Sequence, residues 1–145
     1  MNLLTDKITD KSFIQNLIPQ KKPFVMVDKL FFFSQKKVVS GLTISNENLF
    51  TQANTFMAPG LIEHMAQTVA LYTGYQYFLM NKPAPTGYIG AIKKVELNKL
   101  PFVSQELITT VLILHEIMDV TLVQIKTECE GNIIATSEMK TVLAK

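Results

Sequence analysis

The last third of the chain consists largely of apolar and polar runs separated by turn residues, the pattern of β-strands, and in one of these runs apolar and polar residues clearly alternate. This run is residues 120–129, whose two expected sides carry Leu122, Gln124, Lys126 and Glu128, and Val123, Ile125 and Thr127. The other strands expected here cover residues 88–97, 107–117 and 133–143. Tight turns are expected at residues 118–119 and 131–132. The last third is therefore predicted to be nearly all β-structure.

Two helices are predicted in the first part of the chain. Residues 11–17 form a short helical pattern, with Asp10 or Ser12 as the N-cap. A long helix is expected to start at Pro59, because proline is favoured at the first helical position, and to end before the proline-rich residues 81–86. The long helix is apolar on nearly all sides, which is typical of a helix at the centre of a domain.

Between the two helices, residues 24–33 and 37–45 are rich in β-branched and aromatic side chains and predict two more strands. Residues 46–57 are polar and are expected to be irregular. The order is helix, two strands, long helix, four strands. We therefore expect an α+β hotdog fold, with an antiparallel six-stranded sheet wrapped around one long central helix, in a single domain over residues 1–145. An open sheet edge and an apolar central helix favour a homodimer.

Composition narrows the possible partners and the compartment. The chain has 145 residues, of which 48% are hydrophobic and 18% charged, with a net charge of +2. This charge is too small to argue for nucleic acid, and the polar residues within residues 59–80 argue against a membrane span. One cysteine and no Cys/His cluster predict neither an internal disulfide nor a bound metal. The early charge at Asp6 interrupts any signal-peptide core, so a cytoplasmic protein is expected.

Glu63 is the candidate for chemistry, because it is the only charged residue in the long helix. A carboxylate in a helix suited to burial suits a general acid or base, although acidic residues are also favoured as caps in a first helical turn. Gln67 lies four residues on, so it shares a helix face with Glu63. Ala70 and Gly74 continue this face with small side chains, which leave room for a slender ligand or a partner helix.

Three neighbours of Glu63 are further candidates. The entry at Pro59 is expected to leave the amide N–H groups of Gly60 and Leu61 free, where they could hold a thioester carbonyl oxygen as negative charge develops on it. His64 points about a quarter-turn away from Glu63, so the two do not form a dyad on one helix. His64 is interpreted either as a packing residue between helix and sheet or as a group that meets the Glu63 of a second subunit.

Two segments resemble a known family. Residues 17–30, LIPQKKPFVMVDKL, resemble the opening signature of hotdog 3-hydroxyacyl-(acyl-carrier-protein) dehydratases, which commonly carry His where this chain has Gln20. Residues 63–67, EHMAQ, are similar to the EAMAQ run on the family's central helix, and the element order agrees over nearly the whole chain. The chain is most similar to divergent members linked to polyene pigments and resorcinol lipids. The resemblance implies a lyase of fatty-acid or polyene-type lipid metabolism, acting on acyl-carrier-protein or CoA thioesters without a cofactor.

The chain departs from the family at the catalytic histidine. Family dehydratases pair the helix Glu with a His in an upstream Gly-His-Phe-Pro-Gly segment, and Asn54 stands at that place here. The resemblance then implies that Glu63 serves the leaving hydroxyl, that Asn54 and Gln67 orient groups, that Gly60 and Leu61 polarise the carbonyl, and that Glu63 or His64 replaces the missing base. Two alternatives stay open: an acyl thioesterase that uses Glu63 alone, or a non-catalytic hotdog subunit that binds acyl carrier protein or an active partner.

Overall fold

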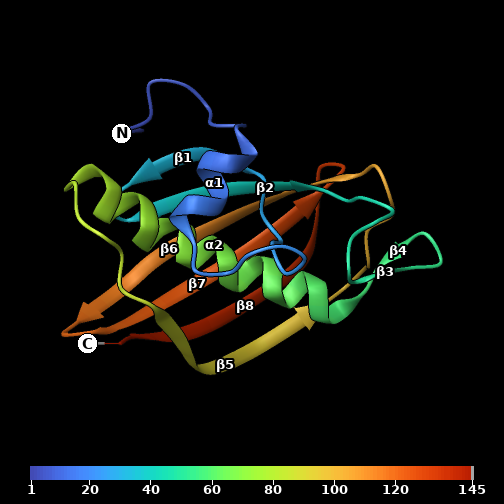
Figure 1. Ribbon diagram of the computed structural model, residues 1–145. Coiled ribbons are helices and arrows are strands. Elements are labelled where there is room, and N and C mark those ends of the chain that lie inside the picture. The colour runs from blue at the N-terminus through green and yellow to red at the C-terminus, as the bar shows by residue number, and fades with distance from the viewer. Residues whose placement is uncertain (145) are drawn as a thin grey trace.

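The computed structural model describes residues 1–144, in which a curved sheet surrounds one long helix (Figure 1). The elements in chain order are α1 (Lys11–Leu17), β1 (Lys29–Ser34), β2 (Lys37–Thr43), β3 (Thr51–Gln52), β4 (Thr55–Phe56), α2 (Ala58–Leu79), β5 (Gly87–Leu97), β6 (Glu106–Ile117), β7 (Val120–Cys129) and β8 (Asn132–Leu143). The long helix and the four C-terminal strands predicted from the sequence are all present.

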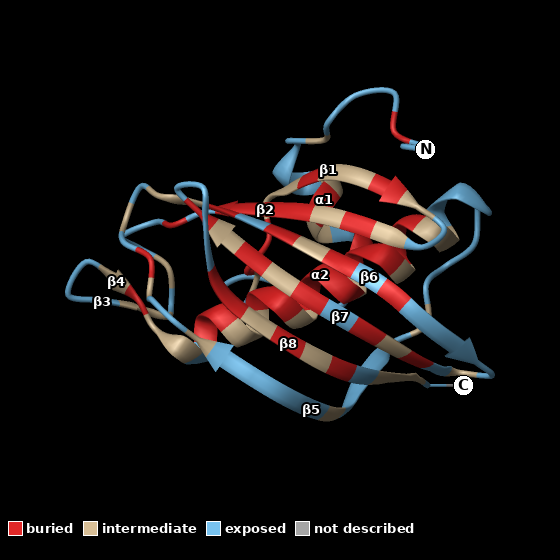
Figure 2. Cartoon of the chain, turned by 180° about the vertical axis from the view of Figure 1, so that it is seen from behind, coloured by how far each residue is buried: buried red, intermediate tan, exposed pale blue. Residues whose placement is uncertain are grey.

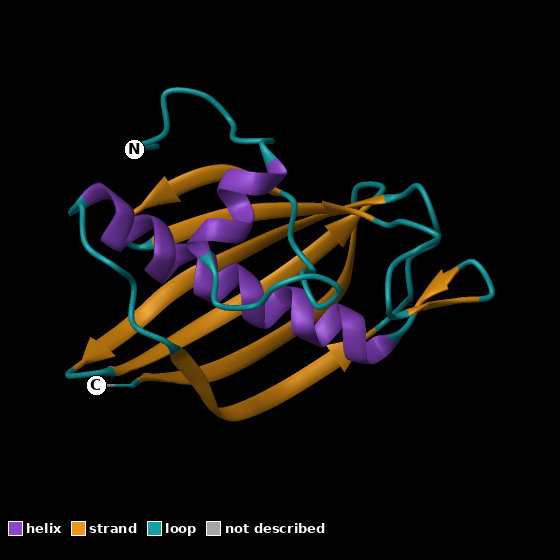
Figure 3. Ribbon diagram, in the orientation of Figure 1, coloured by secondary structure: helices purple, strands orange, loops and turns teal. Residues whose placement is uncertain are grey.

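The main sheet has six strands in the order β1-β2-β6-β7-β8-β5, and every neighbouring pair is antiparallel. Figure 3 shows the sheet curling around α2, with α1 and the loop that follows it on the other side of that helix. The predicted hotdog fold is therefore confirmed. The alternation expected in β7 is also confirmed, because Val123, Ile125 and Thr127 are buried while Gln124 is exposed.

The two helices begin for local reasons. The Asp10 carboxylate accepts hydrogen bonds from the amides of Ser12 (3.0 Å) and Phe13 (3.3 Å), which makes Asp10 the N-cap of α1. Helix α2 begins at Ala58, one residue before the predicted Pro59, and Met57 is its N-cap residue. Proline at the second position of the helix costs no hydrogen bond, because the first amides of a helix have no intrahelical acceptor.

One predicted strand is too long at its start. Residues 24–28 were expected to belong to the first strand, but β1 begins only at Lys29. Met26, in the middle of this segment, forms hydrogen bonds with side chains of α2 through both its backbone amide and its carbonyl oxygen. Side chains of α2 therefore take the place of a neighbouring strand at Met26, whereas the amide of Asp28 already donates to the carbonyl oxygen of Gly41 in β2 over 2.9 Å.

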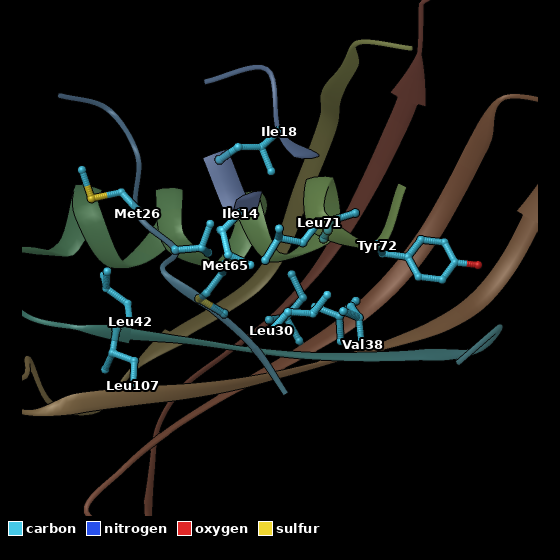
Figure 4. Close-up of a cluster of buried hydrophobic side chains, with 14 of the residues drawn as sticks. Ile14, Ile18, Met26, Leu30, Val38, Leu42, Met65, Leu71, Tyr72 and Leu107 are labelled. Atoms are coloured by element: carbon cyan, nitrogen blue, oxygen red, sulfur yellow. The ribbon is translucent and has the colours of Figure 1, made fainter. Parts of the chain in front are cut away.

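The core lies between α2 and the concave face of the sheet. Figure 4 shows Met65, Leu71 and Tyr72 among the packed side chains, together with residues of β1, β2 and β6. Helix α1 packs closely on α2, because a Cβ at Gly74 would lie 1.9 Å from the carbonyl oxygen of Leu17. Gly74 is therefore needed for the contact between the two helices, and together with Ala70 it also lines a pocket, in line with the small-residue pattern.

Burial differs sharply between the strands. In Figure 2, β6, β7 and β8 alternate between buried and exposed residues, whereas β5 is exposed along almost its whole length. Strand β5 has eleven residues and lies at the edge of the sheet, where it pairs only with β8. The sheet thus ends in a long strand with one row of backbone groups unpaired by the rest of the sheet.

Candidate active site

A pocket of about 480 Å³ lies along one face of α2. It is lined by that helix, by the end of α1 and the following loop, by residues 83–89 and by the end of β8. Among residues 1–144, Glu63 is the only charged side chain in its lining, which otherwise consists largely of small, apolar and hydroxyl side chains such as Ala66, Ala70 and Thr73. Pockets of this size and character are typical of sites for small organic ligands.

Gln67 holds Glu63 in place on this face, as their spacing predicts. The Nε2 group of Gln67 donates to Glu63 Oε2 over 2.8 Å and to the carbonyl oxygen of Phe24 over 2.7 Å. Its Oε1 atom accepts the amide N–H of Met26 over 2.7 Å. Gln67 is fully buried, and because a backbone N–H can only donate, the side-chain amide has one possible orientation.

This hydrogen bond gives the two carboxyl oxygens of Glu63 different roles. Oε2 accepts an N–H group from Gln67, so a proton carried by the carboxyl sits on Oε1. Glu63 is half-buried and lines the pocket, and within residues 1–144 its Oε1 makes no hydrogen bond. Gln67 therefore acts as a positioning residue, because both of its donor hydrogens and its carbonyl are engaged by the protein.

His64 has a different environment although it is the next residue. Its Nδ1 lies 2.6 Å from the carbonyl oxygen of Met26, and its Nε2 lies 2.8 Å from the Thr109 hydroxyl, which in turn lies 2.7 Å from the hydroxyl of Thr127. The carbonyl oxygen only accepts, so Nδ1 carries the proton and Nε2 accepts from Thr109. Burial lowers the pKa of His64 from 6.5 to about 4, which keeps the imidazole neutral at pH 7. This geometry favours the packing interpretation of His64 over a role in proton transfer.

The expectation of free amides at the start of α2 is wrong. The amides of Gly60 and Leu61 both donate to the carbonyl oxygen of Met57, over 3.0 and 3.2 Å, because the helix begins one residue earlier than predicted. Gly60 has a packing reason to be glycine, since a Cβ there would lie 2.5 Å from the Cβ of Phe50. A thioester carbonyl bound in this site needs donors other than these two amides.

Comparisons with known proteins agree with this architecture. The ApeP-like family, described as ApeP dehydratase, matches residues 12–144. The chain belongs to the ApeP-like family. It is also 27% identical over 147 residues to the 3-hydroxyacyl-[acyl-carrier-protein] dehydratase FabZ of Vibrio cholerae, covering 97% of this chain and 95% of that protein. The resemblance to the dehydratase family seen in the sequence is thereby confirmed.

Two solved structures share the fold of this ApeP-like chain. The dehydratase heterocomplex ApeI:P from Xenorhabdus doucetiae superposes with a TM-score of 0.85 at 16% identity, covering 91% of each chain. The HP0420 homologue from Helicobacter felis superposes with a TM-score of 0.69 at 13% identity, covering 99% of this chain and 94% of that one. At these identities the likeness concerns the fold.

Asn54 does not reach the pocket of its own chain in this ApeP-like protein. It lies at the exposed tip of the β3–β4 hairpin with φ of +66°, next to Ala53 with φ of +49°. Two successive residues with positive φ are typical of a tight hairpin turn. The Asn54 carbonyl oxygen accepts the amide of Val103 over 3.1 Å, which ties the tip to the β5–β6 connection. A contribution of Asn54 to the site of a second subunit stays a prediction.

Sequence reasoning missed several contributors to the site. Thr109, a partner of His64, lies 45 residues away along the chain, and Thr127, which bonds to Thr109, lies 63 residues away; their spacing gave no signal. Gln20 was noted only as a departure from the family, but it lines the pocket. Within residues 1–144, no cluster of three His, Cys, Asp or Glu side chains is placed to bind a metal ion, and no helix is long and apolar enough to cross a bilayer.

Proposed function

We propose that this protein removes water from 3-hydroxyacyl thioesters and that Glu63 is its acid–base residue. The observation that carries this proposal is the Glu63 carboxyl, the one charged group of the pocket among residues 1–144, with Oε2 anchored by Gln67 and Oε1 left to exchange a proton. The ApeP-like family and the FabZ relative support the same reaction. No metal or redox group is needed, because elimination beside a thioester requires only acid, base and a polarised carbonyl.

In the proposed reaction, Glu63 transfers the proton in both directions. The ionised carboxylate removes a proton from the carbon next to the thioester carbonyl, and the electron pair of that C–H bond forms the new double bond. The bond from the neighbouring carbon to its hydroxyl breaks, and the leaving hydroxide takes the proton back from Oε1 as water. Glu63 ends in the state in which it began. This single-residue route compensates for the absence of His at position 54.

The substrate in this proposal is an acyl chain on acyl carrier protein or CoA, in fatty-acid or polyene-type biosynthesis in the cytoplasm. The pocket volume of about 480 Å³ lies within the ~300–1,000 Å³ range of small-molecule sites. Its small lining residues on α2, Ala66 and Ala70, give a slender chain access along the helix.

The open β5 edge supports assembly with a second hotdog subunit. The strand exposes apolar side chains beside its unpaired backbone groups, including Tyr88 (62% exposed) and Ile92 (41%). A long exposed edge strand with apolar residues is an aggregation risk unless another chain covers it. A homodimer joined edge to edge is the simplest assembly, and it would leave each Glu63 pocket near the subunit boundary, because Gly87, Tyr88 and Ile89 of β5 also line it.

A second candidate is a non-catalytic subunit that pairs with an active hotdog dehydratase. Asn54 cannot act as a base at neutral pH, and His64 is held by Met26 and Thr109. The structural neighbour from Xenorhabdus is itself a dehydratase heterocomplex. The thioesterase alternative draws on the same lone carboxylate but on no further contact at the site.

The test is to give the purified protein 3-hydroxyacyl thioesters and unsubstituted acyl thioesters of acyl carrier protein. Formation of the enoyl product and release of free thiol are followed separately, and the assembly state is measured by sedimentation. We expect enoyl product without thiol release from a dimer. Thiol release would indicate a thioesterase, whereas a dimer inert toward both substrates would favour the partner-subunit role.

A further inference from the structure

Gln20 carries a buried polar atom that lacks a partner. Among residues 1–144, its Oε1 is the one buried side-chain nitrogen or oxygen with no hydrogen bond. In native proteins roughly 90% or more of buried polar groups are bonded, because leaving one unbonded is costly. Gln20 also lines the Glu63 pocket. An unbonded acceptor in the wall of a ligand pocket calls for a donor from outside the chain.

The loop after α1 lies against α2 at two fixed points. Leu17 lies against Gly74, and the carbonyl oxygen of Phe24 accepts from Gln67. Gln20 lies between these points, directly before a turn in which the Phe24 amide donates to the Lys21 carbonyl oxygen over 2.9 Å. Gln20 and Glu63 both line the pocket.

Glu63 supplies the proton exchange in this pocket, and the unbonded acceptor of Gln20 is left for recognition. We propose that Gln20 is a specificity-determining residue whose side-chain carbonyl accepts a hydrogen bond from an N–H or O–H group of the bound thioester. The donor is either an amide of the carrier arm or a hydroxyl along the acyl chain. The inference rests on the proposed function for the class of ligand.

The proposal is tested by binding rather than turnover, with thioether analogues that cannot react. One analogue carries a pantetheine arm and a plain alkyl chain, a second carries an alkyl arm and a chain with a distal hydroxyl, and a third carries neither donor. Each is titrated by calorimetry into wild type, Gln20→Met and Gln15→Met, in whichever assembly the protein purifies. Methionine matches the length of glutamine but accepts hydrogen bonds only weakly, and Gln15 is half-buried outside the pocket.

We expect Gln20→Met to weaken binding of one donor-bearing analogue by about 2- to 12-fold and to leave the donor-free analogue unchanged. The affected analogue identifies the source of the donor. The ligand-free Gln20→Met protein should melt about 2–4 °C higher, since the unbonded acceptor is gone, whereas Gln15→Met should change neither property.

Equal affinities of wild type and Gln20→Met for both donor-bearing analogues would overturn the proposal, and so would an equal loss for all three analogues. A wild-type protein that lacks dehydratase turnover but still shows the Gln20-dependent preference would refute the proposed reaction and leave the recognition role standing. A wild type that binds none of the analogues would refute both.

Discussion

Glu63 and His64 are adjacent in sequence, yet they lie in two different regions of the same helix. On the pocket side, Glu63 has one protein partner, Gln67, and keeps an oxygen for a ligand. On the sheet side, His64 is fully buried and both of its ring nitrogens are bonded to the protein. The comparison shows that a side chain's bonding capacity left unused by the fold indicates function better than the residue type does. A histidine beside a carboxylate is chemically attractive, but this one has no capacity left.

The first test of this contrast is Glu63→Gln, for which the largest effect is expected. The substitution keeps the shape and the contact with Gln67 but removes the exchangeable proton. Water loss from a 3-hydroxyacyl thioester should fall by about 10² to 10⁴-fold, the usual worth of a positioned acid–base group. Rates are compared at equal concentrations of folded protein, confirmed by circular dichroism. Undiminished turnover in this variant would remove Glu63 from the mechanism.

His64→Leu tests the opposite side of the helix. Leucine leaves the Met26 carbonyl and the Thr109 hydroxyl without their shared partner in the core, at a cost of about 2–5 kcal/mol in the free energy of unfolding. Denaturant titration measures this loss. Turnover per folded molecule at low temperature should stay within a few-fold of wild type, and a loss as large as that of Glu63→Gln would show that His64 takes part in catalysis.

Acidification gives a third test, because His64 titrates differently in the two states. Burial lowers the pKa of His64 in the folded protein to about 4, whereas the unfolded chain has the ordinary value near 6.5. Between these values the unfolded state binds more protons, so stability is fully present above pH 6.5 and is lost as the pH falls toward 4. This pKa difference corresponds to roughly 3 kcal/mol of unfolding free energy, which is lost between these two pH values. The difference in unfolding free energy between wild type and His64→Leu should therefore narrow with falling pH, and a constant difference would contradict the burial of the neutral ring.

The smallest effect is expected from Asn54→His. The residue is exposed and histidine tolerates a positive φ, so the free energy of unfolding should change by less than about 0.5 kcal/mol. The rate of water loss from a 3-hydroxyacyl thioester then tests whether one chain or two subunits form the site. It should not change if the hairpin tip stays away from any Glu63, and it should rise if a second subunit brings the tip to the site. A variant that fails to fold would contradict the exposed position of this residue.

The fold was predictable from the sequence because its signals are local. Alternation along residues 120–129 and the Asp10 cap gave their elements with the observed bounds. The site was predictable only where it lies within a single helix, as in the four-residue spacing of Glu63 and Gln67. Contacts between distant segments left no such pattern. The free amides expected at Gly60 and Leu61 were wrong because a shift of one residue in the helix start supplies both with an acceptor.

The hydrogen bonds of His64 also bear on the order in which the protein folds. They join α2 to Met26 before it and to Thr109 in a strand that comes much later in the chain, and Thr109 in turn bonds to Thr127 of the next strand. Because contacts of such sequence separation form slowly, we expect α2 to take its final position only after β6 has been made. A nascent chain that has not yet extended past β6 still exposes the apolar surface of α2 that packs against that strand.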